Sequence, residues 1–146
     1  RLGWLIAPNN IIKNIEKLSM SLFLCPSTIA QNIATKAFDD YDILNKNVTL
    51  YKKNRDLMIN FFEDIGFSKY APVDGAFYLY LDISRITDDS GKLARNLLND
   101  AGVSVTPGED FDHKLGKKYI RISYGGSTQD IIEAIKRIDN WLNTKI

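Results

Sequence analysis

The sequence predicts an α+β fold: a two-layer α/β sandwich with a small, mostly antiparallel sheet, preceded by helices of which one is long. From residue 76 onward the patterns follow the order strand, helix, strand, strand, helix. Two helices on one face of a small sheet make a two-layer sandwich. The first 70 residues are mostly helical in pattern, and no Gly/Ser-rich linker divides the chain. The 146 residues are enough for one core, since a chain of this size buries about 68–70% of its unfolded surface.

The part before residue 70 is predicted to begin with a short strand and to continue as three helices. Residues 2–7 (LGWLIA) are mostly apolar and favour a strand. Apolar residues at helical spacing predict a helix over 11–24 and a second one after it, with Ser27 as the N-cap. Residues 42–66 form the longest helical candidate, and Gly66 is its expected C-cap.

The part after residue 70 supplies the sheet and two further helices. Residues 76–83 (AFYLYLDI) are rich in aromatic and aliphatic side chains and predict a strand. A helix is expected over 88–102, with polar N-caps at its start and a glycine at its end. Short strands are predicted at 103–106 and 119–124, and Ser127 is expected to cap a final amphipathic helix.

Composition excludes several classes of function. Nineteen Lys and Arg against 18 Asp and Glu leave a net charge of +1, so no basic surplus indicates nucleic-acid binding. No apolar run approaches the ~20 residues that span a bilayer, and the first residues lack the pattern of a signal peptide. The single cysteine (Cys25) and the single histidine (His113) argue against disulfides and metal sites, so we predict no metal. The simplest expectation is a reducing, cytoplasmic compartment.

One side chain in the predicted strand YIRISYG is a candidate for binding. Strand alternation places Tyr119, Arg121 and Ser123 on one face and Ile120, Ile122 and Tyr124 on the other. Arg121 is then either a solvated residue on the open face or a side chain that points into a cleft. In the second case its guanidinium could hold a carboxylate through two parallel hydrogen bonds.

Two other stretches leave alternatives open. In VDGAFYLYLD, Phe77 belongs either to a core strand or to the lining of a pocket. In VSVTPGEDFD, Pro107-Gly108 predicts a tight turn, and the acidic residues that follow lack the spacing of a calcium loop. His113 beside Asp112 could pair as base and orienter, but no nucleophile accompanies them.

Taken together, five stretches resemble the C-terminal part of the class I/II aminotransferases, the pyridoxal-phosphate enzymes of the aspartate aminotransferase fold type. The resemblance covers essentially the whole chain and follows the family's order: RLGWLIAP, PSTIAQNIATKAF, VDGAFYLYLD, AGVSVTPGEDFD and YIRISYGGS. It implies that Arg121 binds the α-carboxylate of the amino-acid substrate, that Phe77 lies close to that arginine, and that Arg1 binds the cofactor phosphate. Asp112 departs from the glycine that is frequent at this place in the family, which leaves the subgroup open.

The resemblance also implies what the whole protein does. Its members transfer an amino group between an amino acid and a 2-oxo acid with pyridoxal 5'-phosphate, usually as homodimers. The lysine that forms the Schiff base would precede residue 1, so we expect no catalytic residue in this chain and no activity from it alone. Residues 1–10 would be a remnant strand of the large cofactor-binding domain. Residues 11–146 would be the small domain, with connecting helices at 11–66. We expect residues 2–7 to pair with another copy of the chain or to pack irregularly.

Three alternatives to an aminotransferase stay open from the sequence. Other pyridoxal-phosphate enzymes of the same fold type are lyases, decarboxylases or synthases, and the residues that separate them would lie upstream. Some transcription regulators carry an aminotransferase-like domain that senses a ligand. A free-standing small-molecule-binding module is the third alternative.

Overall fold

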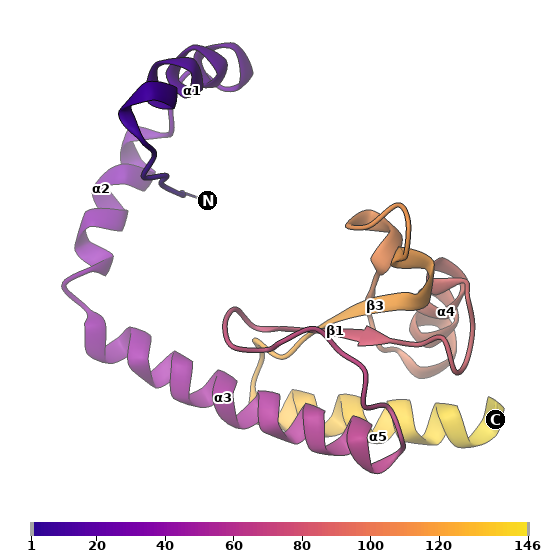
Figure 1. Ribbon diagram of the computed structural model, residues 1–146. Coiled ribbons are helices and arrows are strands. Elements are labelled where there is room, and N and C mark those ends of the chain that lie inside the picture. Colours follow the sequence, from indigo (N-terminus) through magenta and orange to yellow (C-terminus); the bar gives the residue numbers. More distant parts are fainter. Residues whose placement is uncertain (1, 146) are drawn as a thin grey trace. The chain divides into compact units, whose positions relative to one another are not determined.

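The computed structural model describes residues 2–145, which form five α-helices and a three-stranded sheet (Figure 1). The chain divides into two compact units, residues 1–46 and 47–146. The boundary falls inside the longest helix, α3 (Tyr41–Asp64). None of the described helices is long and apolar enough to cross a membrane.

The first unit contains two amphipathic helices without a core of their own. Helix α1 (Asn9–Leu22) and helix α2 (Thr28–Ala37) have no buried residue. The rings of Trp4 and Phe38 contact each other with centroids 5.6 Å apart, yet both side chains stay largely exposed. This unit therefore presents most of its apolar side chains on its surface.

The strand predicted at residues 2–7 is not formed, and that prediction is wrong. Residues 2–8 have no regular secondary structure. A strand needs a neighbour that accepts and donates its backbone hydrogen bonds, and the sheet that the described residues form includes only later strands. Ser27 stands at the predicted N-cap position of α2, but its side chain makes no capping hydrogen bond.

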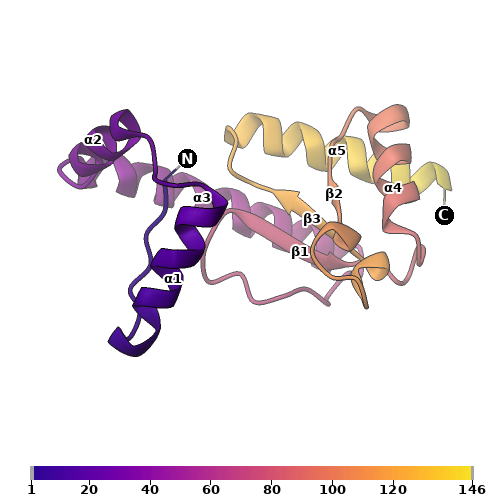
Figure 2. The ribbon, with the colours of Figure 1, turned by 90° about the horizontal axis from the view of Figure 1, so that it is seen from above.

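The second unit is built on an antiparallel sheet of three short strands. Strand β3 (Tyr119–Ser123) lies in the centre, between β1 (Tyr78–Asp82) and β2 (Thr106–Pro107). Both neighbours of β3 run antiparallel to it. Figure 2 shows this sheet from above. The predicted α+β class with a small antiparallel sheet is confirmed.

Helices cover one face of the sheet and close the core. Helix α5 (Thr128–Lys145) and the second half of α3 run beneath it, as Figures 1 and 2 show. Helix α4 (Ser90–Asn96) continues into a short π-helical segment, η1 (Leu97–Ala101), and packs at the β2 side. Three helices thus contribute to this layer, one more than the two that the sequence predicts.

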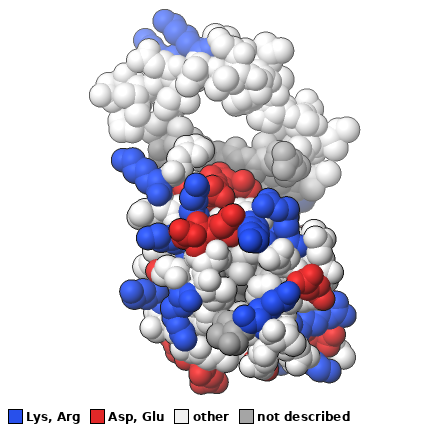
Figure 3. Space-filling view, turned by 90° about the vertical axis from the view of Figure 1, so that its right-hand side faces the viewer, with Lys and Arg blue, Asp and Glu red and all other residues white. Residues whose placement is uncertain are grey.

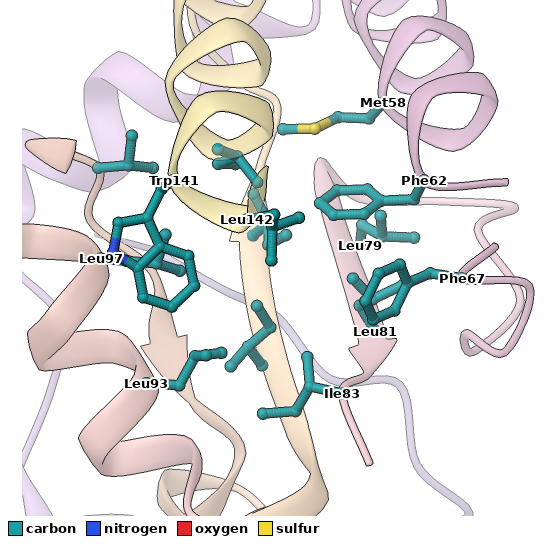
Figure 4. Packing of buried hydrophobic residues seen from close by; sticks show 14 of the residues in the cluster. Met58, Phe62, Phe67, Leu79, Leu81, Ile83, Leu93, Leu97, Trp141 and Leu142 are labelled. Atoms are coloured by element: carbon teal, nitrogen blue, oxygen red, sulfur yellow. The ribbon is translucent and has the colours of Figure 1, made fainter. Parts of the chain in front are cut away.

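The core joins apolar side chains from all these elements. Figure 4 shows Phe62 of α3 beside Leu79 of β1, Leu142 of α5 in the centre of the cluster, and Trp141 of α5 beside Leu97 of η1. The residues most fully removed from solvent in this cluster lie on α3, on β1 and directly after β1; they are Met58, Leu79, Leu81 and Ile83. On the face that Figure 3 draws, Lys and Arg side chains are interspersed with Asp and Glu over this unit.

Two strands begin later than predicted, because the backbone before them is hydrogen-bonded elsewhere or has a conformation that a strand does not allow. The predicted strand at 103–106 is reduced to two residues, because the Val103 N–H donates to the Leu97 carbonyl at the end of η1 (3.2 Å). Gly102 makes the turn there with a φ of 66°. The predicted strand at 76–83 begins only at Tyr78, since Ala76 has a φ of 58° that no strand allows.

Three predicted helix ends are confirmed in detail. Gly66, with a φ of 84°, follows the end of α3 and donates to the Glu63 carbonyl. Asp89 caps α4 by accepting the Lys92 N–H (2.8 Å). Ser127 caps α5 by accepting the N–H of Asp130, three residues on.

Candidate functional site

Arg121 lies in the middle of the central strand, and its side chain leaves the sheet on the face opposite the core. Its sequence neighbours Ile120 and Ile122 are buried (3% exposed each), whereas Arg121 is half-buried, so the predicted alternation is confirmed. The register places Tyr80 of β1 and Thr106 of β2 on either side of Arg121. The guanidinium is therefore mounted on a rigid element with a strand to each side.

Two aromatic rings lie against the guanidinium of Arg121. Its central carbon is 4.4 Å from the ring centroid of Tyr78 and 4.5 Å from that of Phe111. One Nη donates a hydrogen bond to the Thr106 Oγ1 (3.3 Å). These contacts come from β1, from the loop after η2 (Gly108–Asp110) and from β2.

The positive charge of Arg121 has no carboxylate partner among the described residues. The ion pairs of residues 2–145 form elsewhere, on α2, α3 and α5 and between α5 and η1. A guanidinium carries five N–H donors, and within residues 2–145 the hydrogen bond to Thr106 uses one of them. Arg121 can therefore receive an external carboxylate or another planar anion in bidentate fashion.

The structure places Phe77 near Arg121 through an intermediate ring. The Phe77 and Tyr78 rings are in contact, with centroids 4.3 Å apart, and Tyr78 in turn contacts Arg121. Phe77 also contacts Tyr51 of α3 (5.8 Å between centroids). Among the described residues, the rings in cation–π contact with Arg121 are those of Tyr78 and Phe111 and not that of Phe77. Arg1, to which the resemblance assigns the cofactor phosphate, lies outside the described residues.

The backbone before Phe77 is held in a strained conformation. Ala76 adopts the left-handed region that non-glycine residues rarely enter, at a cost of about 1–2 kcal/mol. The Tyr124 N–H donates to the Phe77 carbonyl (2.9 Å) and extends the pairing of β1 and β3 by one bond. The turn therefore fixes the position from which the Phe77 side chain projects.

The end of β3 is tied to α3 by a buried amide. The Asn54 side chain is fully buried and donates to the carbonyls of Tyr124 (3.0 Å) and Gly126 (2.9 Å). Its Oδ1 accepts the Thr128 hydroxyl (2.8 Å) at the start of α5. All polar atoms of this amide face partners, so Asn54 fixes the segment that follows Arg121.

The loop that carries Phe111 is held by local hydrogen bonds. The Phe111 N–H donates to the Gly108 carbonyl (2.9 Å). One carboxylate oxygen of Asp112 accepts the N–H groups of Lys114 (2.8 Å) and Leu115 (3.1 Å). These backbone donors, first that of Leu115, lower the pKa of Asp112, so the turn is made by the ionised carboxylate. Asp112, which departs from the resemblance, is thus an ordinary turn residue here.

Two glycines let the same loop fold back on itself. Gly108 and Gly116 are both buried, and a Cβ added to either would overlap the backbone of the other. The 3₁₀ turns η2 and η3 (Gly116–Lys118) meet at this point. This contact positions the base of the loop that carries Phe111.

Tyr80 and Tyr119 extend the aromatic face beside Arg121. Their rings stack with centroids 4.9 Å apart and planes 6° from parallel. Burial raises the pKa of Tyr80, and the nearby carboxylate of Asp112 raises it further. The phenol is therefore neutral at pH 7 and supplies no countercharge to Arg121.

Sequence reasoning missed four residues of this site, namely Asn54, Tyr78, Thr106 and Phe111. Tyr78 had a signal, since alternation puts it on the same face of β1 as Tyr80. The register that brings it to Arg121 depends on the folded sheet. Within residues 2–145, no cluster of three or more His, Cys, Asp or Glu side chains could hold a metal ion.

Comparisons with known proteins show the family and the fold of this chain. The profile of the family described as "Aminotransferase class I and II" matches residues 1–138. A valine–pyruvate aminotransferase of Mycobacterium tuberculosis is 39% identical over 97% of this chain, and an aspartate aminotransferase of Sulfolobus acidocaldarius is 31% identical over 98%. The crystal structure of an aminotransferase from Mycobacterium tuberculosis superposes on 97% of the chain with a TM-score of 0.85 at 38% identity.

The coverage of these relatives is unequal. Each match spans nearly all of this chain but only 37% of the relative, whether in sequence or in structure. Identity, coverage and fold agree on one family for the part that is present. The chain belongs to the class I and II aminotransferases.

Proposed function

We propose that this chain is the part of a pyridoxal-phosphate-dependent aminotransferase that binds the carboxylate of the amino-acid substrate. The observation that carries the proposal is Arg121, which has no ionic partner within residues 2–145 and is held by three elements on the open face of the sheet. The family membership supplies the reaction in which such an arginine is useful. The whole protein would transfer an amino group between an amino acid and a 2-oxo acid, as a homodimer.

The chain contributes binding and orientation. Arg121 would hold the carboxylate through two N–H groups, and this pairing would fix the direction of the bond from the carboxylate carbon to Cα. Phe77 and the neighbouring aromatic rings would border the bound molecule and limit its access to water. The relatives are named for valine–pyruvate and for aspartate, and these amino acids share the carboxylate and differ in the side chain. Arg121 would recognise the shared group.

Pyridoxal 5'-phosphate supplies the electron sink on which amino-group transfer depends. Arg1 would contact the phosphate of the cofactor. We assign no cofactor-binding role to any of the described residues. The lysine that the reaction requires has no counterpart in this sequence, so the chain would not catalyse by itself.

The test is the kinetics of the complete protein with Arg121→Ala. Hydrogen bonds to charged groups contribute up to ~3 kcal/mol, so KM for the amino acid should rise by roughly 100-fold. Arg95→Ala, which removes an exposed arginine of α4, should leave KM unchanged and serves as the control. Unchanged kinetics in Arg121→Ala would refute the assignment.

The isolated chain gives a complementary test. The 146 residues should show no transaminase activity when pyridoxal 5'-phosphate, an amino acid and a 2-oxo acid are supplied together. Turnover above the rate of the cofactor in buffer would contradict the proposal that the reactive lysine lies outside this chain.

A further inference from the structure

The contacts of Arg121 raise the question of why its charge is held by rings rather than by a carboxylate. Tyr78 and Phe111 both lie within 4.5 Å of the guanidinium carbon. They are 33 positions apart in the sequence and belong to a strand and a loop.

Aromatic rings hold an arginine without consuming its donors. The attraction acts between the cation and the face of the ring, whereas the N–H groups point outward in the guanidinium plane. A structural aspartate or glutamate would instead occupy the same N–H groups that a ligand needs. Thr106 accepts one N–H at 3.3 Å, and no hydrogen bond from another N–H of Arg121 is formed to the residues that the structure describes.

Both rings are themselves held in place. Tyr78 lies in β1 opposite Ser123, and its ring contacts that of Phe77 at a centroid distance of 4.3 Å with the two planes tilted by 46°. Phe111 is 53% exposed, but its backbone N–H is hydrogen-bonded to Gly108 within the loop that the contact of Gly108 and Gly116 holds in place. An exposed phenylalanine in a rigid loop is not explained by burial, and its contact with Arg121 accounts for it.

We propose that Tyr78 and Phe111, called here the aromatic clamp, are positioning residues that hold the Arg121 guanidinium with its N–H edge directed at the substrate carboxylate. This inference rests on the proposed function and adds the residues that prepare the arginine for binding. Without the clamp, the long arginine side chain samples several rotamers and must be ordered each time a carboxylate binds. The clamp therefore acts on affinity, equally in the ground state and in the transition state.

The experiment compares ring-removing and ring-keeping variants of the complete protein. Phe111→Leu and Tyr78→Leu should each raise KM for the amino acid roughly tenfold, with kcat within about twofold, because the lost binding is uniform. Phe111→Tyr and Tyr78→Phe keep the ring faces and should keep KM. Leu115→Ala alters an exposed side chain of the same loop and should also keep KM.

A substrate without a carboxylate separates positioning from general damage. With a simple alkylamine as amino donor, the rate constant kcat/KM should be the same in Phe111→Leu, Tyr78→Leu and the wild type. An equal loss with the amine and with the amino acid would show a merely structural role and would overturn the clamp. The clamp is also overturned if Arg121→Ala raises KM while both leucine variants leave it unchanged, an outcome that leaves the proposed function standing. If Arg121→Ala itself has no effect, the proposed function fails first.

Discussion

At the scale of single residues, the chain shows how a few polar groups are satisfied inside a small core. Asn54 is buried completely, and its amide meets two backbone carbonyls and one hydroxyl. An amide can be buried at low cost only when its donors and acceptor are all paired. Asn54 meets this condition and links α3 to the segment after β3.

Replacing Asn54 by alanine should be among the most destabilising single changes in the chain. It would leave the buried carbonyl of Tyr124 without its side-chain donor and remove the acceptor of the Thr128 hydroxyl. We expect a loss of about 2–4 kcal/mol in the free energy of unfolding, measured by urea denaturation. Asn60→Ala, on the exposed side of the same helix, should change stability by less than about 0.5 kcal/mol. Equal effects of the two changes would contradict the role of the buried amide.

Ser90 should behave in the opposite way. Its hydroxyl is fully buried and has no hydrogen-bond partner among the described residues. An unpaired buried hydroxyl costs about 1–3 kcal/mol, so Ser90→Ala should raise the melting temperature measured by circular dichroism. A lower melting temperature in Ser90→Ala would show that the hydroxyl contributes to stability.

Asp100 should give the chain an acid-sensitive contact. The indole N–H of Trp141 (3.1 Å) lowers the pKa of Asp100, and the ammonium group of Lys145 lowers it further. A carboxyl group with a lowered pKa in the folded state stabilises the fold above its unfolded pKa of about 3.9. That stability is lost as the pH falls through the folded pKa. The difference in unfolding midpoint between wild type and Asp100→Asn should therefore shrink below about pH 4. A difference that stays constant from pH 6 to pH 3 would contradict the linkage.

At the scale of elements, local sequence patterns predict most helices. The residues of the site, in contrast, are brought together by contacts between segments that are far apart in the sequence. The 3.6-residue spacing of apolar side chains anticipates α1, α3 and α5, because an amphipathic helix carries its pattern within itself. Strand β2 is shorter than the preceding Val103 and Val105 indicate, because the Val103 N–H is hydrogen-bonded to the end of η1. The meeting of Phe111 with Arg121 needs the folded loop and the register of β3, which no local pattern contains.

The folded-back loop can be tested through its glycines. Gly116→Ala would force a Cβ into the backbone of Gly108, so the loop must shift, and we expect Phe111 to move relative to Arg121. We expect a loss of about 2 kcal/mol or more in stability, measured by thermal unfolding. In the complete protein, KM for the amino acid should also rise. Gly75→Ala has open space around its Cβ and should leave stability nearly unchanged.

At the scale of the whole molecule, the two units differ in how much they bury. Every buried residue among the described positions belongs to the unit of residues 47–146. The unit of residues 1–46 instead exposes large apolar side chains, among them Trp4 (74%), Ile6 (91%) and Leu24 (76%). The hydrophobic contribution to folding is therefore concentrated in one unit.

This asymmetry predicts different behaviour of two polypeptides in solution. Residues 47–146 should unfold cooperatively at nearly the same temperature as the whole chain, since they hold the core. The whole chain should bind more of a hydrophobic dye and scatter more light, because exposed apolar patches favour association. Thermal unfolding and static light scattering check this expectation. A shorter polypeptide without a cooperative transition would show that residues 1–46 are needed for the core.

The positive φ of Ala76 places selection for stability in conflict with selection for substrate binding. Glycine is the residue that relieves a positive φ best, so the most stable variant of this turn carries glycine at position 76. The same change would free the backbone from which Phe77 projects toward the ring of Tyr78. Selection for thermostability should therefore favour glycine at position 76, whereas selection for tight carboxylate binding should retain alanine. The residue at position 76 thus indicates which of the two selective pressures has been stronger.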